Sequence, residues 1–289
     1  MPLDNDYIQE NIRKLRKILK KNPKRPPPEL IHKLRTQSRR FEAIDEALGL
    51  GYKPKDRKAL KRLKSIRKKA GRVRDMDVLT GHLCTVHEDV EQDSLVQLFE
   101  HLGTERYSQA ARLRRLSQKF ALAIRKRLKM CSKRVNKIVG RDAKGAPAEA
   151  GELALRLSNE LAIPAVLNRT NLHPYRLKVK ELRYILQLSQ DSRHEEFVNA
   201  LGQCKDAIGE WHDWEQLIVT AADLLDQRAS SKRMAALRRI SGQKYRFALS
   251  TTEKMRRTYA STADRSKRSS SRTNIPPQPA LKAIAKVAA

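Results

Sequence analysis

Amphipathic helical periodicity runs through most of this 289-residue chain. Leu, Ala, Lys, Arg and Gln, which favour helices, are abundant, whereas aromatic residues make up only 5% of the chain and strand patterns are few. We therefore expect an all-α fold. The periodicity predicts helices near residues 4–21, 29–48, 55–71, 74–88, 93–102, 105–138, 152–166, 173–190, 193–209, 211–228 and 231–256.

Proline and glycine mark the predicted helix boundaries. Pro26, Pro27 and Pro28 separate the first two helices, and the segment from Gly49 to Pro54 ends the second. The segment 140–151 (GRDAKGAPAEAG) is predicted to link two halves, 1–140 and 151–257, of one helical domain spanning 1–257. The remaining residues, 258–289, are rich in Ser, Arg, Lys and Pro and are expected to form a disordered basic tail.

The chain carries a large and uneven positive charge. It has 62 Lys and Arg residues against 32 Asp and Glu residues, a formal net charge of +30. Residues 1–140 have a net charge of +20 and residues 230–289 of +13, whereas residues 151–229 have a net charge of −3. Because this excess charge repels itself in a compact state, a polyanionic partner would relieve it. Nucleic acid, an anionic membrane and polyphosphate all have the required charge.

Several classes of protein are disfavoured by the sequence. The three cysteines, Cys84, Cys131 and Cys204, have neither the spacing of a disulfide framework nor that of a zinc site. The first residues lack the pattern of a secretory signal, and no apolar run approaches the ~18 residues of a membrane span. We therefore expect a protein of the reducing cytoplasm that does not insert into a membrane.

Two short motifs recur in the same order in the two halves. The first is a His followed three positions later by a basic residue and four positions further by another, at His32-Arg35-Arg39 and at His173-Arg176-Lys180. The second is Gly-x-x-x-Asp-x-Asp/Glu-x-Leu, beginning at Gly71 and at Gly209. The recurrence of both motifs at similar separation indicates an internal duplication.

The spacing of these basic residues places them on shared helix faces. Positions i, i+3 and i+7 lie on one side of a helix of ~3.6 residues per turn, so each His motif forms a basic stripe opposite an apolar one. Residues 53–74 hold 12 basic side chains and one acidic one, and residues 112–137 hold 11 basic and no acidic ones. Since the usual compensating acids at i+4 are missing, we favour anion binding over a merely solvated charged face.

In these motifs the chain resembles the CHAD family, the conserved histidine alpha-helical domain. The matching residues are His32, Arg35, Arg39, Arg40, Gly71, Arg74, Asp75 and Asp77, then His173, Arg176, Lys180, Arg183, Gly209, His212, Asp213 and Glu215. The resemblance covers roughly residues 4–256. It departs from the family pattern at Pro174, which places His173 at the edge of its helix.

The resemblance implies two helical bundles related by a pseudo-twofold axis, with basic residues of both copies lining a central cleft that binds inorganic polyphosphate. Family members occur alone, at polyphosphate granules, or fused to a triphosphatase whose Glu-x-Glu-x-Lys motif this sequence lacks. The residues expected to contact polyphosphate are His32, Arg35, Arg39, Arg40, Lys61, Lys64, Lys68, Arg72, His173, Arg176, Lys180 and Arg183. Asp75 and Asp213 are expected to anchor basic side chains of the preceding motif.

Metal binding is the alternative role for the two motif histidines, and base stacking is the alternative role for the two tryptophans. Neither His32 nor His173 is accompanied by a cluster of metal ligands, so phosphate contact is favoured over metal binding, and no cofactor is expected. Trp211 and Trp214 are predicted to lie in the core.

Three functions remain as hypotheses. Binding of polyphosphate, in the cytoplasm and at granules, is preferred. Non-specific binding of DNA or RNA is the alternative, although no recognised nucleic-acid-binding signature is present. Catalysis is not expected, because the sequence has neither a phosphate-cradling glycine loop nor a carboxylate cluster for metals. No protein partner is identifiable.

Overall fold

The computed structural model describes residues 1–86, 92–141, 145–225 and 231–259, and this part of the chain is all-α, as predicted. Of the predicted disordered tail, 258–289, residues 258 and 259 belong to the last turn of the final helix, and residues 260–289 lie outside the described residues. The α-helices are α1 (Asn5–Ile18), α2 (Pro28–Leu48), α3 (Pro54–Leu83), α4 (Gln92–Arg141), α5 (Gly145–Ala162), α6 (Leu172–Leu186), α7 (Glu195–Leu224) and α8 (Ser231–Tyr259). Two short 3-10 turns lie at Leu50–Tyr52 and Ser192–His194.

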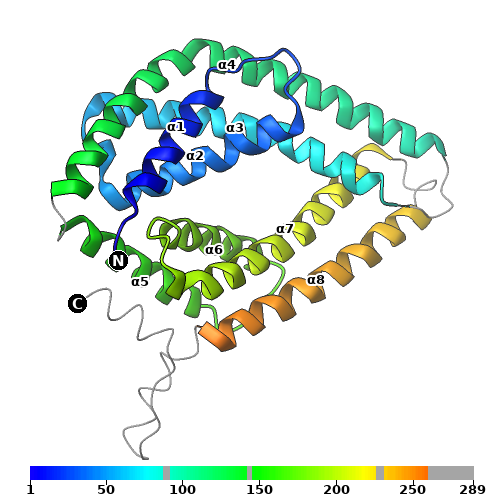
Figure 1. Cartoon of the computed structure of the whole chain (residues 1–289). Coiled ribbons are helices and arrows are strands. Elements are labelled where there is room, and N and C mark those ends of the chain that lie inside the picture. The colour runs from blue at the N-terminus through cyan, green and yellow to red at the C-terminus, as the bar shows by residue number, and fades with distance from the viewer. Residues whose placement is uncertain (87–91, 142–144, 226–230, 260–289) are drawn as a thin grey trace, which may run out of the picture.

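The helices fall into two groups that follow the order of the chain. Helices α1 to α4 lie together, with α4 arching over the other three, and α5 to α8 form the second group (Figure 1). Within the groups, α3 packs along α4 and α7 packs along α8. Between the groups, α2 contacts α5 and α6, and α3 contacts α7. The contacts of α2 with α6 and of α3 with α7 position the functional site.

The predicted helix boundaries at proline and glycine are confirmed. Pro28 and Pro54 each occupy the first turn of their helix, where an amide donor is not needed. Gly49 ends α2 in the left-handed conformation, with φ of 55°, which glycine adopts without steric cost. His173 is the second residue of α6, so it lies at the helix edge as expected.

Three predicted helix breaks are wrong. The chain continues as one helix through residues 71–74 in α3, 102–105 in α4 and 209–211 in α7. The interior glycines Gly71 and Gly209 do not end their helices because other side chains pack over them, as described below. Gly103 has no such neighbour and is simply tolerated inside a long helix. The predicted linker 140–151 is helical at 140–141 and 145–151.

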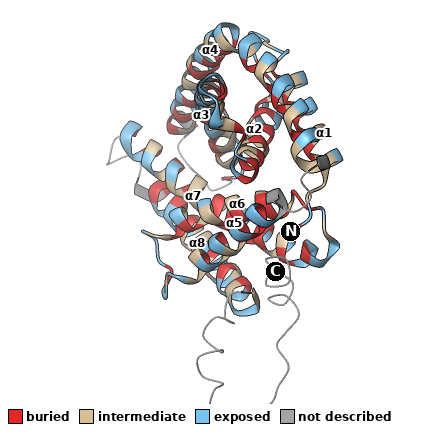
Figure 2. Ribbon diagram, turned by 90° about the vertical axis from the view of Figure 1, so that its left-hand side faces the viewer, coloured by how far each residue is buried: buried red, intermediate tan, exposed pale blue. Residues whose placement is uncertain are grey.

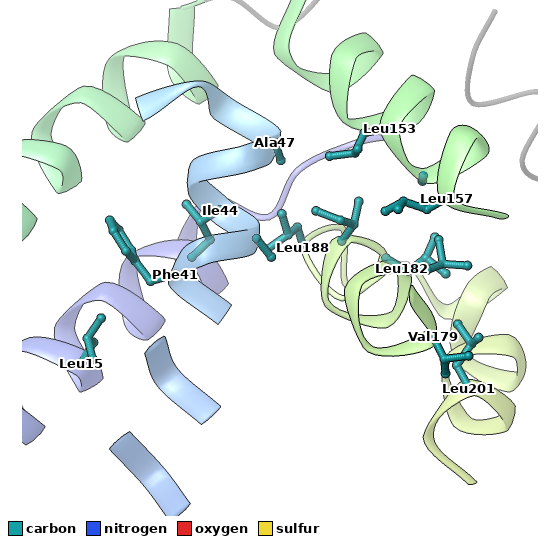
Figure 3. Close-up of a cluster of buried hydrophobic side chains, with 14 of the residues drawn as sticks. Leu15, Phe41, Ile44, Ala47, Leu153, Leu157, Val179, Leu182, Leu188 and Leu201 are labelled. Atoms are coloured by element: carbon teal, nitrogen blue, oxygen red, sulfur yellow. The ribbon is translucent and has the colours of Figure 1, made fainter. Parts of the chain in front are cut away.

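One hydrophobic core runs through both groups of helices. The buried residues lie on the inward sides of the helices in each group (Figure 2), and residues of α1 to α8 belong to a single cluster. Figure 3 shows Ile44 and Ala47 of α2 in this cluster together with Leu153 of α5 and Leu182 of α6. The two groups are therefore held together by shared apolar packing. The internal duplication stays a prediction.

The predicted burial of the two tryptophans is confirmed, since Trp211 and Trp214 are each 3% exposed. Trp211 packs in the large core, whereas Trp214 belongs to a smaller cluster formed by α3, α4, α7 and α8. His82 of α3 stacks on Trp214 with ring centroids 4.6 Å apart. These contacts join α3 to α7 beyond the site.

A buried ion pair fixes the first turn of α3 against α4. The Asp56 side chain is 1% exposed, and it accepts hydrogen bonds from Arg127 at 2.7 Å and from Arg134 at 2.5 Å. Because the two guanidinium groups satisfy both carboxylate oxygens, the charge can be buried without an unpaired acceptor.

Candidate functional site

A cavity of about 830 Å³ opens between α2 and α3 on one side and α6 and α7 on the other. These are the four helices that carry the repeated motifs: the His motifs lie on α2 and α6, and the Gly-x-x-x-Asp motifs on α3 and α7. The wall is formed by residues within 32–39 of α2, 67–79 of α3, 173–184 of α6 and 205–220 of α7, with Glu105 and Gln109 of α4, so helical hydrogen bonding fixes the backbone that positions each side chain.

The fold brings most of the predicted site residues together at this cavity. The predicted phosphate ligands in its wall are His32, Arg35, Arg39, Arg72, His173, Arg176 and Lys180, and both predicted anchors, Asp75 and Asp213, line it as well. Residues far apart in the sequence thus face a common space.

Five predicted ligands lie elsewhere. Arg40 points toward α1, where it donates a hydrogen bond to Asn11 at 3.3 Å. Arg183 packs against α7 and donates to the carbonyl of Val198 at 3.3 Å. Both side chains are used to hold neighbouring helices. Three lysines lie on the exposed side of α3, outside the cavity wall: Lys61, Lys64 and Lys68.

Three cationic residues of the wall were missing from the predicted ligands: Arg67, Arg74 and Lys205. Arg74 directly precedes the motif Asp75. Arg67 and Lys205 each lie four residues, or one helical turn, before the motif glycine of their own helix. Extending the repeated motif by one turn toward its N-terminal side would have found them both.

The motif glycines allow an arginine of the facing helix to approach the backbone. A Cβ atom added to Gly71 would lie 2.8 Å from Nη1 of Arg35, and one added to Gly209 would lie 2.9 Å from both Cζ and Nε of Arg176. Arg176 also donates from Nε to the carbonyl oxygen of Lys205 at 3.0 Å. The same contact between the two motifs therefore occurs in both halves. It explains why glycine stands inside α3 and α7.

The predicted anchoring role of the aspartates differs in geometry between the halves. Asp75 lies 3.4 Å from Nη1 of Arg35, a distance that fits anchoring. Asp213 forms no ion pair within the described residues; burial raises its pKa, and the guanidinium of Arg176 is close enough to offset part of that shift. Arg176 is instead oriented by the backbone of α7.

Glu42 links two further cations of the wall. Its carboxylate lies 3.3 Å from Nη1 of Arg39 and 2.7 Å from Nε of Arg67, so α2 and α3 are joined by one shared acid. Only 11% of the Arg67 side chain is exposed. The ion pair with Glu42 therefore compensates a nearly buried positive charge.

Comparison with known families settles the relationship of the chain. The family model described as the CHAD domain matches residues 6–226, which is most of the chain. The chain belongs to the CHAD domain family. Domains of this family are associated with polyphosphate binding in general. No curated protein and no solved structure matched in the corresponding comparisons.

The wall of this CHAD domain carries more positive than negative charge. Eight arginine and lysine residues line the cavity, against five carboxylates, which are Asp75, Glu105, Asp206, Glu210 and Asp213. Four of the cations form no ion pair with any described residue, namely Arg72, Arg74, Arg176 and Lys180. These uncompensated charges remain available to an anion, and guanidinium groups offer phosphate oxygens paired donors in a plane.

Lys180 is the most perturbed of these cations. Burial, together with the positive charges of Arg176 and Arg39, lowers its pKa to about 7. Without a bound anion, the ammonium form of Lys180 is therefore only partly populated near neutral pH. An anion in the cavity would favour that form and draw a proton onto Lys180.

The two motif aspartates lie near one another in the wall. Burial and the negative charge of Asp75 raise the pKa of Asp213 to about 6, although Arg176 opposes the shift. The pKa of Asp75 is also raised by burial. The Asp75 side chain is 58% exposed, but it lines the cavity, where protein replaces much of the bulk water. Partial loss of hydration can therefore raise its pKa.

The histidines of the wall are kept neutral. The rings of His173 and His212 lie 3.9 Å apart, and burial, followed by the effect of His173, lowers the pKa of His212 to about 4. Burial also lowers the pKa values of His173 and His32, and nearby cations add to it. Neutral imidazoles can donate one hydrogen bond each to a phosphate oxygen.

The described residues contain neither a cluster of metal ligands nor a membrane-spanning helix. No group of three or more His, Cys, Asp or Glu side chains in this part of the chain is arranged to hold a metal ion. Among the helices described, none has an apolar stretch that could cross a lipid bilayer.

Proposed function

We propose that this CHAD domain binds inorganic polyphosphate in the cavity between α2, α3, α6 and α7. The observation that carries the proposal is the convergence of four ion-pair-free cations from two helices, α3 and α6, on one cavity, beside the arginines held over the motif glycines. A polyphosphate chain has a negative charge on every unit and no bases, so a set of fixed cations is sufficient to recognise it.

The shape of the site favours a single chain over a duplex. A cavity of about 830 Å³ between helices is too small for double-stranded nucleic acid, whose major groove alone is about 12 Å wide. A single strand of phosphates would contact both halves of the protein at once. The preference for polyphosphate over nucleic acid at this site is part of the proposal.

We further propose that the domain binds without chemistry and that it associates with polyphosphate granules. The absence of a phosphate-cradling glycine loop from the sequence supports the first point. Release of inorganic phosphate from long-chain polyphosphate by the purified chain would contradict it. Co-sedimentation with isolated granules, compared with the cavity variant described next, tests the second.

The decisive experiment uses a variant that removes charge from the wall without removing its packing. The cavity variant carries Arg39→Gln, Arg74→Gln and Lys180→Gln; Arg67 still pairs with Glu42 in it. A matched control carries Arg238→Gln, Arg246→Gln and Lys254→Gln, three exposed positions of α8. Labelled long-chain polyphosphate is titrated against both, and duplex DNA at matched phosphate concentration is used as competitor at two salt concentrations.

We expect the cavity variant to bind polyphosphate at least about tenfold more weakly, since each charge-assisted contact contributes roughly 1.5–3 kcal/mol. The control should bind like the wild type. If both variants bind equally well, or if DNA displaces polyphosphate as readily as polyphosphate itself does at both salt concentrations, the cavity is not a polyphosphate site.

A further inference from the structure

The outer side of α4 carries a row of cations that the cavity does not use. Going along the helix in steps of three or four residues, exposed positions 115, 119, 122, 126, 129, 133 and 137 are Arg, Lys, Leu, Lys, Lys, Lys and Lys. This spacing keeps them on one face. At ~1.5 Å per residue the row is about 33 Å long. We call these seven residues the α4 ridge.

The α4 ridge is separate from the cavity. None of its residues lines the cavity wall, and α4 arches over α1, α2 and α3 with its exposed side outward (Figures 1 and 2). The surface is therefore convex and belongs to a single continuous helix. Three lysines of the neighbouring α3 are exposed as well: Lys61, Lys64 and Lys68.

Nothing within the described residues neutralises this charge. The sequence has no acidic residue between positions 112 and 137, and none of the six cations of the ridge forms an ion pair with a described residue. By contrast, the inward arginines Arg127 and Arg134 of the same helix share the buried Asp56. Arg127 and Arg134 are thus paired within the fold, whereas the cations of the ridge are left for an external anion.

A stiff polyanion fits a convex ridge better than a flexible one. A flexible chain would lose conformational entropy on being straightened along the surface, with no walls to hold it. Double-stranded nucleic acid has a persistence length of ~50 nm and holds its phosphates in place before binding. Its helical turn of about 34–36 Å matches the length of the ridge.

A lipid surface fits less well. A helix that lies in a membrane interface needs an apolar face to insert, with aromatic or leucine side chains opposite its charges. On the ridge Leu122 is the only apolar residue, and the exposed Met130 at its side adds one more. Six cations with so little apolar surface favour phosphate contact in water.

We infer that the α4 ridge is a second binding site, which takes the phosphate backbone of double-stranded nucleic acid without reading its base sequence. The inference does not depend on the function proposed for the cavity. The protein would hold a duplex on its convex side while the cavity remains free for another anion.

The test separates the two sites by variants of the full chain. The ridge variant carries Lys126→Gln, Lys129→Gln and Lys133→Gln, which preserve helix propensity at exposed positions. It is compared with the wild type, the cavity variant and the α8 control, which has the same change in charge as the other two. The probes are a DNA duplex of about 20 base pairs, roughly two helical turns, long-chain polyphosphate, and vesicles containing phosphatidylserine. Circular dichroism checks the helix content of each protein.

We expect the ridge variant to lose DNA affinity about tenfold or more and to keep its polyphosphate affinity, while the cavity variant does the reverse. The slope of log affinity against log salt concentration for DNA should fall by about 3 in magnitude, since each lost phosphate contact removes roughly one. Unchanged DNA binding by the ridge variant would overturn the inference, as would tighter binding of the wild type to the vesicles than to DNA. A cavity variant that keeps polyphosphate affinity overturns the proposed function alone.

Discussion

The guanidinium carbon of Arg176 lies 2.9 Å from the point where a Cβ atom on Gly209 would stand. No atom could occupy that point without moving the arginine, because three atoms of its guanidinium group surround it. Gly209 therefore acts on the site through Arg176. Because Gly209 has no side chain, the guanidinium can contact the backbone of α7 and donate to the carbonyl of Lys205.

Replacing Gly209 with alanine should weaken binding without unfolding the protein. The new methyl group displaces Arg176, and we expect polyphosphate affinity to fall about tenfold, or ~1.4 kcal/mol. Alanine favours a helix interior over glycine by up to ~1 kcal/mol, which offsets part of the steric cost. Titration with polyphosphate and urea unfolding of the same variant measure the two effects. An unchanged affinity would show that the position of Arg176 does not matter.

Gly103 provides the matched substitution, because it also lies inside a helix but has no neighbour within 4 Å of an added Cβ atom. We expect Gly103→Ala to raise the free energy of unfolding by about 0.5–1 kcal/mol and to leave polyphosphate affinity as it is. A loss of stability would contradict the continuous course of α4 through this residue. The measurement is again urea unfolding.

Polyphosphate binding should tighten as the pH falls from 8 to 6. Lys180, with a pKa of about 7, gains a positive charge over this range, and Asp213, with a pKa of about 6, begins to lose its negative charge. Both changes favour a bound anion, so the complex takes up protons and its affinity falls as the pH rises. A shift of one unit in the pKa of Lys180 would change affinity up to about tenfold.

Two variants divide this pH dependence between its sources. Lys180→Arg keeps the charge at every accessible pH and should remove the dependence around pH 7. Asp213→Asn should remove the dependence around pH 6 and tighten binding at pH 8. Isothermal titration in buffers of different ionisation enthalpy counts the protons directly. Equal heats in all buffers at pH 7 would rule out the coupling.

Asp56→Asn should destabilise the fold by roughly 3 kcal/mol, because it leaves Arg127 and Arg134 facing a neutral group in a buried position. Asp223→Asn, at an exposed position near the end of α7, is the control and should have little effect. Chemical unfolding of both variants gives the comparison. A loss below 1 kcal/mol for Asp56→Asn would mean that this ion pair is not needed to hold α3 against α4.

The sequence was sufficient for the fold class, because the apolar period of each helix depends only on local spacing. It was not sufficient for the continuity of helices. Gly71 and Gly209 resemble helix ends when each is considered alone, and only the arginine across the interface explains them. A glycine placed for close approach has the same local pattern as one placed for a turn.

The site itself was predictable only in part, and α3 illustrates the reason. Arg67 and Lys68 are neighbours in a basic run, yet Arg67 faces the cavity and Glu42, whereas Lys68 faces solvent. The spacing of charged residues predicts which of them share a helix face, but it does not predict whether that face lines the cavity or lies in solvent. The motif that combines a glycine with an aspartate lies at the cavity in both halves, because its glycine marks a contact between helices.

The ion-paired Asp56 at the start of α3 limits how the sequence of this helix can evolve. The ion pairs of Asp56 fix the rotation of α3 about its own axis, and Asp75 lines the cavity about five turns later. One residue inserted or deleted between them would rotate Asp75 and every following side chain by ~100° out of the wall. The residues between these two aspartates can therefore be exchanged freely on the outer side of α3, while their number is held constant.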